Sequence, residues 1–268
     1  MSSFEDISRA DSTLVSRFHE DGYIVLEDLI DVDEIESLRI SALKNFDELQ
    51  TIIRAKNAIQ SEHLDKVQSN TDGSMESSMG IGIKNCFKEI VQRHACRFEM
   101  PYKMDNEEFA VVLRCPRIMK VVRGILGEDC VVINKSLVIS SPGADDQAWH
   151  SDGPHLSATQ DLPCHCLNVF VPLVDVTSLN GPTQFRPGSV NMTRNLKVEM
   201  LKAMVRKTLR PIDGPTLRRG SVLLFDYRVL HRGTKNSSST PRPVLVYTFA
   251  KPYYKDTLNF PKKSVFDT

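Results

Sequence analysis

The sequence has no apolar run approaching the roughly 20 residues that a membrane-spanning helix needs. Its opening, MSSFEDISRADSTLV, carries acidic side chains where a secretory signal peptide needs a basic stretch followed by an apolar one. The closing Phe266-Asp267-Thr268 is not a peroxisomal address of the Ser-Lys-Leu type. These absences argue against secretion and membrane insertion, so we expect a cytoplasmic protein.

The sequence also lacks net charge and is poor in cysteine. Its 34 basic residues balance 34 acidic ones, which gives no sign of a nucleic-acid or membrane partner. The six cysteines are too few and too widely spaced for the disulfide framework of a small secreted domain, so reduced thiols are expected. A zinc site at Cys164-His165-Cys166 is disfavoured, because no second cysteine pair follows at zinc-finger spacing. Nothing in the sequence indicates the oligomeric state.

Helical spacing dominates the part of the chain before residue 131. The pattern predicts two helices within 11–45 around a short strand at 23–26, and short packed helices at 87–94 and 109–126. Residues 46–80 are polar and poorly periodic, and they end in turn formers. A long stretch of this kind is either a functional loop or an ordinary disordered one, so it is a candidate lid.

From residue 131 the sequence changes to β-branched and apolar runs that are separated by turn formers. Apart from a helical insertion at 196–209, the predicted strands lie at 131–139, 167–174, 183–186, 221–227 and 244–250. Helices followed by a run of strands indicate an α+β, mainly β chain whose second part is a sandwich or barrel. A chain of 268 residues fits one principal domain of this kind.

His150 and Asp152 are the first candidate site residues. Because side chains alternate along an extended strand, these two leave the same face. They offer one imidazole nitrogen and one carboxylate oxygen, which is two thirds of the 2-His-1-carboxylate triad that holds non-haem Fe(II). The tripeptide alone fits a polar turn before Gly153-Pro154 equally well, so support must come from elsewhere in the chain.

Two residues late in the strand-rich part complete the pattern. His231 follows the predicted strand at 221–227 and lies next to Arg232-Gly233, where a neutral imidazole can approach an ion. Arg242 stands at the entrance to the strand at 244–250. An arginine that enters a barrel needs an anionic partner, which a dicarboxylate co-substrate would supply. Taken singly, each residue also fits an ordinary loop position.

Together these residues resemble the phytanoyl-CoA dioxygenase family of Fe(II)- and 2-oxoglutarate-dependent oxygenases. The resemblance extends to Phe18-x-x-Asp21-Gly22-Tyr23, Gln147-x-Trp149-His150-x-Asp152, Asn180-Gly181-Pro182-Thr183 and Gly220-Ser221-Val222-Leu223. It implies a double-stranded β-helix (jelly-roll, cupin-like) core at about 131–255 with the helices of about 1–130 outside it. The whole chain, 1–268, would then be a single domain.

The resemblance also implies roles for individual residues. His150, Asp152 and His231 would bind Fe(II), and Arg242 would bind the distal carboxylate of 2-oxoglutarate. Gln147 and Lys135 match residues that lie near the co-substrate in some relatives.

A hydroxyl that commonly assists the arginine is missing from its usual positions, where this chain has Gly233 and Val244. Thr183, Thr234 and Thr248 are the alternatives for that hydroxyl, and the sequence does not choose among them. Trp149 and His155 are candidate substrate contacts, with core packing and a supporting hydrogen bond as their respective alternatives.

The expected cofactors are Fe(II), 2-oxoglutarate and O2. The expected reaction oxidises an unactivated C–H bond of a small molecule, usually by hydroxylation, and releases succinate and CO2. Asp152 separates the chain from related halogenases, which have a small residue at this position. Two alternatives stay open: a catalytically silent jelly-roll binding module, and a cupin-type metal dioxygenase that does not use 2-oxoglutarate. The sequence does not indicate the substrate.

Overall fold

The computed structural model describes residues 4–68, 86–257, 259 and 262–267. The helices are α1 (Phe4–Asp21), α2 (Val32–Gln68), α3 (Val111–Arg114), α4 (Pro116–Leu126) and α5 (Leu196–Arg206), with short 3-10 turns η1 (Glu107–Phe109) and η2 (Met192–Asn195). The strands are β1 (Tyr23–Leu26), β2 (Cys86–Phe87), β3 (Ile90–His94), β4 (Arg97–Met100), β5 (Val131–Ser140), β6 (Cys166–Pro172), β7 (Thr183–Phe185), β8 (Val222–Asp226), β9 (His231–Gly233) and β10 (Arg242–Ala250).

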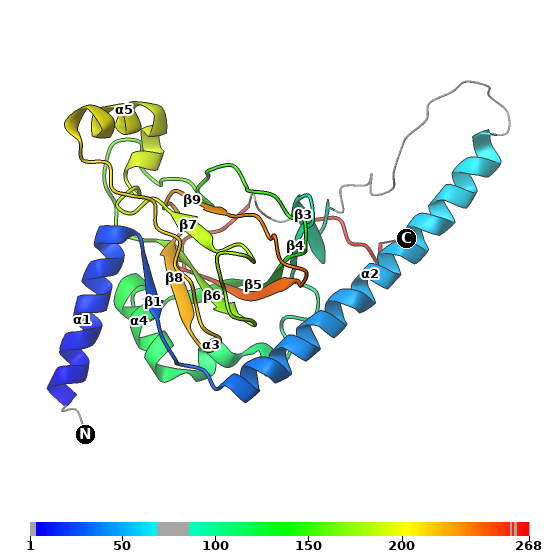
Figure 1. Ribbon diagram of the computed structural model, residues 1–268, viewed down its shortest axis with the longest axis horizontal. Helices are drawn as coiled ribbons and strands as arrows, with labels where there is room; N and C mark the ends of the chain where they lie inside the picture. Colours follow the sequence, from blue (N-terminus) through cyan, green and yellow to red (C-terminus); the bar gives the residue numbers. More distant parts are fainter. Residues whose placement is uncertain (1–3, 69–85, 258, 260–261, 268) are drawn as a thin grey trace.

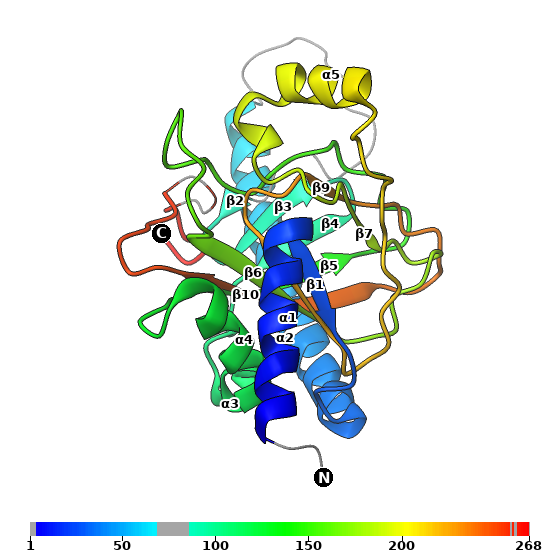
Figure 2. The same ribbon diagram turned by 90° about the vertical axis from the view of Figure 1, so that its left-hand side faces the viewer.

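Eight of these strands form one antiparallel sheet in the order β1-β8-β6-β10-β5-β4-β3-β2. The helices α2, α3 and α4 lie on one side of it, and the two-stranded sheet β7-β9 lies on the other (Figures 1 and 2). Single bridges widen the small sheet, because Phe185 also pairs with Asp213 and His231 with His150. This two-layered antiparallel arrangement agrees with the predicted jelly roll.

The main apolar core fills the space between the large sheet and the helices. Leu137 and Ile139 of β5 and Leu245 of β10 project into it, together with Ile35 and Leu38 of α2. Burying an aliphatic side chain of this size contributes about 1.5–3 kcal/mol. Since side chains alternate along a strand, every second residue of β5 and β10 points instead into the space between the two sheets, where a polar cavity lies.

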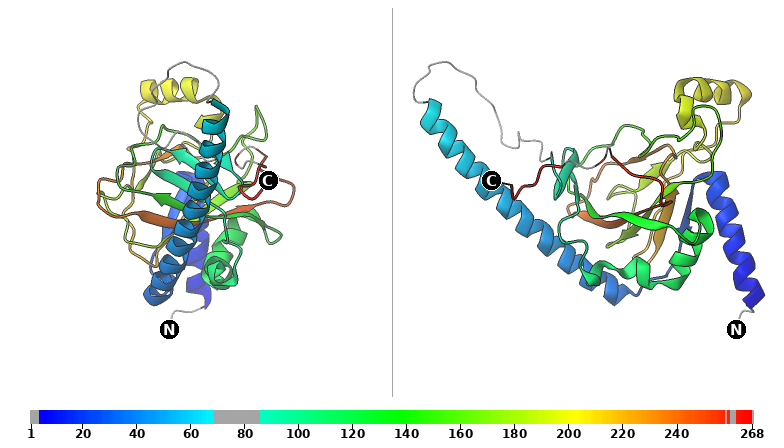
Figure 3. Two further views of the ribbon diagram at one scale, coloured as in Figure 1. Left: turned by 90° about the vertical axis from the view of Figure 1, so that its right-hand side faces the viewer. Right: turned by 180° about the vertical axis from the view of Figure 1, so that it is seen from behind.

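Helix α2 shows that the predicted loop is wrong over residues 46–68. The helix runs unbroken to Gln68, and it contains neither glycine nor proline. Phe46, Leu49 and Ile53 are buried at helical spacing, so the apolar stripe of the first turns continues into the polar stretch. Figure 3 shows the helix running past the sheet. The rest of the predicted lid, residues 69–80, lies outside the described residues.

The predicted helix at 87–94 is also wrong, because this segment forms strands β2 and β3. Strand β3 pairs with β4, and β4 pairs with β5, so the segment extends the large sheet. Cys96 takes a positive φ of 57° in the tight turn between β3 and β4. The ladder hydrogen bonds available at the edge of β4 outweigh a short stretch of helical spacing. The part before residue 131 is therefore not purely helical.

Helix α5 confirms the predicted insertion and stands away from the body of the protein (Figure 1). None of its residues is fully buried. Lys207 ends the helix in the left-handed conformation, with φ 56°, and its backbone N–H bonds back to the last turn. Among the described helices, none is both long and apolar enough to cross a membrane.

The Cys164-His165-Cys166 segment is packed as core. The Cys164 thiol donates to the backbone carbonyl of Cys166 at 3.3 Å. His165 is 1% exposed and packs on the ring of Tyr254, and neither of its ring nitrogens has a hydrogen-bond partner. Burial, reinforced by the nearby Arg228 charge, lowers the pKa of His165 from 6.5 to about 4.

The folded state should therefore become less stable as the pH falls from 6.5 to about 4. The neutral form of His165 is favoured in the folded state, so its full contribution is present above pH 6.5 and is lost toward pH 4. The pKa difference corresponds to a loss on the order of 3 kcal/mol. In urea unfolding of the wild type and of His165→Leu, both free of metal, the wild type should lose on the order of 3 kcal/mol relative to the variant as the pH is lowered from 6.5 to 4. Parallel curves would contradict the prediction.

Candidate metal centre

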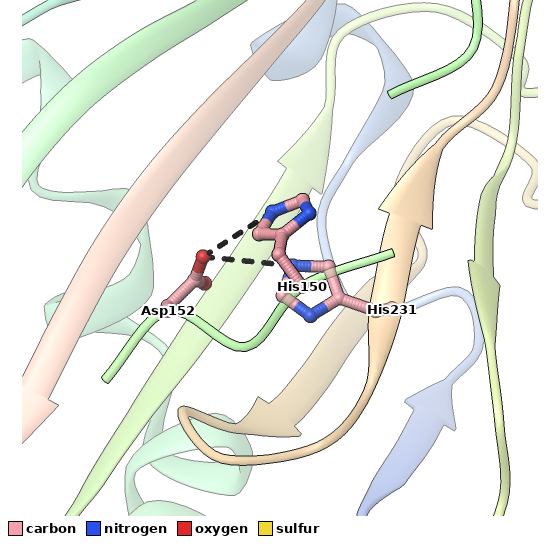
Figure 4. A group of neighbouring side chains, drawn as sticks. All are labelled: His150, Asp152 and His231. Atoms are coloured by element: carbon pink, nitrogen blue, oxygen red, sulfur yellow. Dashed lines mark ion pairs between the residues drawn. The ribbon is translucent and has the colours of Figure 1, made fainter. Parts of the chain in front are cut away.

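The structure brings His150, Asp152 and His231 together, as Figure 4 shows. The Oδ1 atom of Asp152 lies 3.7 Å from Nε2 of His150 and 3.6 Å from Nε2 of His231. One donor atom from each residue lies within 4.8 Å of the other two. No second set of three His, Cys, Asp or Glu side chains in the described part of the chain meets this condition. Two imidazoles and one carboxylate are the donor set of a non-haem iron triad.

Backbone pairing places the three residues. His150 and His231 exchange two N–H···O bonds, at 3.0 and 2.9 Å, so their rings leave adjacent strands side by side. The backbone N–H of Asp152 donates to the carbonyl of Tyr227 at 2.8 Å, which fixes the third residue against the end of β8. The donor atoms of His150 and Asp152 therefore lie together as predicted, with His150 in an isolated antiparallel bridge to His231 and Asp152 in the bend that follows it.

Each histidine presents Nε2 to the centre because Nδ1 is already bonded. Nδ1 of His150 lies 2.8 Å from the carbonyl of Ala148, and Nδ1 of His231 lies 3.0 Å from that of Val229. A carbonyl can only accept, so each Nδ1 carries the proton and each Nε2 keeps its lone pair. Burial lowers the pKa of His231, although the Asp152 charge opposes this effect. His231 is thus held in the neutral form that binds metals.

A cavity of about 410 Å³ adjoins the triad between the two sheets. Its volume lies at the lower end of the range for small-molecule sites, which is about 300–1,000 Å³. Most of the residues that line it are polar. Besides the triad, the polar lining includes Arg93, His94, Arg97, Glu99, Gln147, Asn168, Thr183, Tyr227, Arg242, Thr248 and Asn259.

Arg242 enters this cavity from the first position of β10. It is 3% exposed, and its Nε atom has no hydrogen-bond partner. No carboxylate of the described residues forms an ion pair with it. Burial, followed by the charge of Arg97, lowers the pKa of Arg242 to about 9. A buried guanidinium without an anion is costly, so the site is built for an anionic ligand.

Arg97 is a second buried cation in the cavity, and the sequence analysis missed it. It lies on β4 opposite Ser140, and Arg242 lies opposite the same serine on β10. Arg97 donates to the carbonyl of Thr234 at 2.9 Å, but its Nε has no partner, and neither has the Ser140 hydroxyl. Arg97 of β4, Ser140 of β5 and Arg242 of β10 therefore lie side by side on adjacent strands, and each has a polar atom without a hydrogen-bond partner. The alternation of charged and apolar residues in Arg97-Phe98-Glu99-Met100 was the sequence signal that could have revealed this strand and its arginine.

Gln147 and Thr183 both line the cavity, as expected of co-substrate contacts. The Gln147 Oε1 atom accepts a hydrogen bond from the backbone N–H of Gly233 at 3.0 Å. A Cβ atom on Gly233 would lie 2.6 Å from that oxygen and 2.5 Å from Nη1 of Arg97, so any larger residue there would force Gln147 and Arg97 to shift.

The structure also narrows the choice among the three candidate hydroxyls. Thr234 donates to the carbonyl of Pro182 at 2.6 Å, and Thr248 donates to Asn168 at 2.7 Å. Both of these hydroxyl protons are therefore engaged with protein groups. Thr183 is the remaining candidate for the hydroxyl beside Arg242.

Lys135 and Trp149 were expected to contact the co-substrate and the substrate, but neither lines the cavity. Lys135 alternates with the cavity-facing residues of β5 and lies on the opposite face, where its Nζ is 3.5 Å from Asp105. Trp149 is outside the cavity lining, with the guanidinium groups of Arg186 and Arg232 at 5.9 and 5.1 Å from its ring.

His155 lines a neighbouring groove that shares Ser151 with the main cavity. Its Nε2 atom lies 2.9 Å from the hydroxyl of Thr193. Burial, followed by the charges of Arg228 and Arg194, lowers the pKa of His155. Its position in the groove next to the main cavity keeps it a candidate for contact with a substrate.

Comparison with known proteins agrees with this geometry. The sequence profile described as phytanoyl-CoA dioxygenase (PhyH) matches residues 18–244, which is most of the chain. The chain belongs to the phytanoyl-CoA dioxygenase family. Membership places it among the non-haem iron, 2-oxoglutarate-dependent dioxygenases, and it confirms the resemblance seen in the sequence.

Two relatives of this PhyH-family chain are ectoine dioxygenases. The Stutzerimonas stutzeri protein is 26% identical over 258 residues, which cover 88% of this chain and 75% of that protein. The Halomonas elongata protein is 30% identical over 148 residues, and that match spans only 44% of its length.

Among solved structures, HygX from Streptomyces hygroscopicus, crystallised with nickel and 2-oxoglutarate, superposes with a TM-score of 0.59. It shares 15% sequence identity, and the match covers 90% of this chain and 87% of that one. This likeness confirms the jelly-roll fold.

Proposed function

We propose that this protein uses Fe(II), 2-oxoglutarate and O2 to oxidise an unactivated C–H bond of a small molecule, with release of succinate and CO2. One observation carries the proposal: the triad and the unpaired, buried Arg242 open onto the same 410 Å³ cavity. A silent binding module has no need of three metal-ligating side chains. A cupin-type dioxygenase without 2-oxoglutarate has no need of a buried cation beside them.

His150, Asp152 and His231 are the proposed iron ligands, since their donor atoms fit the ion that this family uses. Bound iron and 2-oxoglutarate together supply the activation of O2. The remaining cavity residues position and shield the reactants. Gln147 supports the wall beside the triad through Gly233.

Arg242, Arg97 and Thr183 are the proposed anchors of 2-oxoglutarate. Both arginines flank Ser140, so their guanidinium groups lie near one another in a region that water does not reach freely. A dicarboxylate that satisfies them relieves the cost of two buried cations, and this makes the pocket selective for an anion.

The relatives support a small polar substrate. They include ectoine dioxygenases, and HygX has been crystallised with hygromycin B. The modest size of the cavity and its polar lining agree with a substrate of this kind. We also propose that 1–268 acts as one domain, because β1 near the start of the chain pairs with β8 in the catalytic half.

Anaerobic reconstitution tests the proposal. Fe(II) and 2-oxoglutarate should together give a weak visible charge-transfer band that neither gives alone, and His150→Ala should lose it. Iron binding without the band would favour a metal dioxygenase that does not use 2-oxoglutarate. Absence of iron binding, together with no succinate formed in air, would favour a binding module. Succinate release with candidate substrates then searches for the substrate.

A further inference from the structure

Asp152 has a second oxygen that is bonded to the protein. Its Oδ1 atom lies 3.7 and 3.6 Å from the Nε2 atoms of His150 and His231. Its Oδ2 atom accepts a hydrogen bond from the Nδ2 of Asn168 at 2.8 Å. Asn168 lies within β6 and is only 4% exposed. The two carboxylate oxygens are therefore assigned to different neighbours.

Thr248 fixes which end of the Asn168 amide meets Asp152. The Thr248 hydroxyl donates to the Oδ1 of Asn168 at 2.7 Å, from the position directly opposite on β10. An ionised carboxylate only accepts hydrogen bonds, so the amide must turn its NH2 group to Asp152 and its oxygen to Thr248. Both side chains are buried, which removes water as a competing partner. The contacts form a directed chain from Thr248 through Asn168 to Asp152.

A register shift lies beside Thr248, on the β5 side of β10. The pairing of β10 with β5 shifts register between Thr248 and Phe249, and bulges of this kind turn side chains next to active sites. Thr248 keeps its normal pairing with Asn168 on β6 across the same stretch. The regular pairing of β10 with β6 thus holds the Thr248 hydroxyl next to Asn168.

We propose that Asn168 and Thr248 are positioning residues that keep Asp152 bound to the metal through one oxygen. This inference rests on the proposed function. A carboxylate can bind a metal through one oxygen or through both. Binding through both would use a coordination position that the co-substrates need, since the triad is useful because it leaves three positions open. Holding Oδ2 in a hydrogen bond to Asn168 prevents this.

Asn168→Leu removes the hydrogen bond and keeps the approximate size of the side chain. We expect the variant to bind Fe(II) about 10–100-fold more weakly in anaerobic equilibrium dialysis, the usual effect of losing a partner of a metal ligand. At saturating Fe(II) and 2-oxoglutarate, its charge-transfer band should be shifted or weakened. Asn134→Leu is the matched control, because Asn134 is a half-buried amide that bonds Glu99 and Ser136 without touching a ligand. It should retain wild-type iron affinity.

A second pair of variants, at Thr248, tests the inference even if Asn168→Leu folds poorly. Thr248→Val should shift iron affinity and the band in the same direction by a smaller factor, and Thr248→Ser, which keeps the hydroxyl, should restore both. Wild-type affinity and band in Asn168→Leu and Thr248→Val would overturn the inference, as would equal effects of Val and Ser at 248. Absence of the band in the wild type would instead overturn the proposed function.

Discussion

Replacing Arg242 with methionine should raise the 2-oxoglutarate concentration for half-maximal succinate formation by about 100-fold or more, because two hydrogen bonds between charged groups contribute on the order of 3 kcal/mol or more. The same variant should fold at least as stably as the wild type. Arg242 is buried without an anion, so its removal relieves a desolvation cost in the free protein. Succinate formation over a range of 2-oxoglutarate concentrations measures the first effect, and thermal unfolding without 2-oxoglutarate measures the second.

Arg228 supplies the matched control for this prediction. It is as buried as Arg242, at 3% exposed, but it forms a two-point ion pair with Asp226, with N···O distances of 2.9 and 2.8 Å. Arg228→Met should therefore destabilise the fold by about 3–5 kcal/mol, since it leaves Asp226 buried and unpaired. If Arg242→Met were destabilised to the same degree and kept its 2-oxoglutarate requirement, Arg242 would be a structural arginine.

Asp152→Ala should abolish turnover and weaken Fe(II) binding by about 1,000-fold, which corresponds to roughly 4 kcal/mol. It removes the one anionic donor of the triad and leaves two neutral imidazoles facing each other. The charge-transfer band should then be absent at iron concentrations that saturate the wild type. Anaerobic iron titration followed by addition of 2-oxoglutarate measures both quantities.

Asp161→Ala is the control for this change. Asp161 is an exposed carboxylate that pairs with Arg194 at 2.7 Å, outside the main cavity. Removing an exposed ion pair typically costs less than about 1 kcal/mol, so iron binding and turnover should stay at wild-type values. Retention of tight iron binding by Asp152→Ala would show that the protein holds the metal at another site.

Several features could be predicted from the sequence because short-range rules decide them. The period of two along an extended segment puts His150 and Asp152 on one face, and the structure shows their donor atoms together. The β-branched runs after residue 131 and the turn formers between them gave the strands of the jelly roll. The need of a buried guanidinium for an anion singled out Arg242.

Other features could not be predicted because they depend on which strands become neighbours. Residues 87–94 have helical spacing, but they form strands that extend the sheet beyond β4. The pairing of β4 and β10 with the two edges of β5 brings Arg97 level with Arg242, although the two residues are far apart in the chain. Lys135 illustrates the reverse case, because the register of β5 sends it to the face away from the cavity.

The sequence by itself singled out the three candidate metal donors and the cation beside them, through residue type, the spacing of His150 and Asp152, and the resemblance to one family. Only the tertiary structure decided what surrounds them. Asn168 and Thr248 lie 80 positions apart, and they meet Asp152 because β6 pairs with β10 beneath it. Hydrogen bonds between distant strands follow from the register of the sheet, which local spacing does not encode.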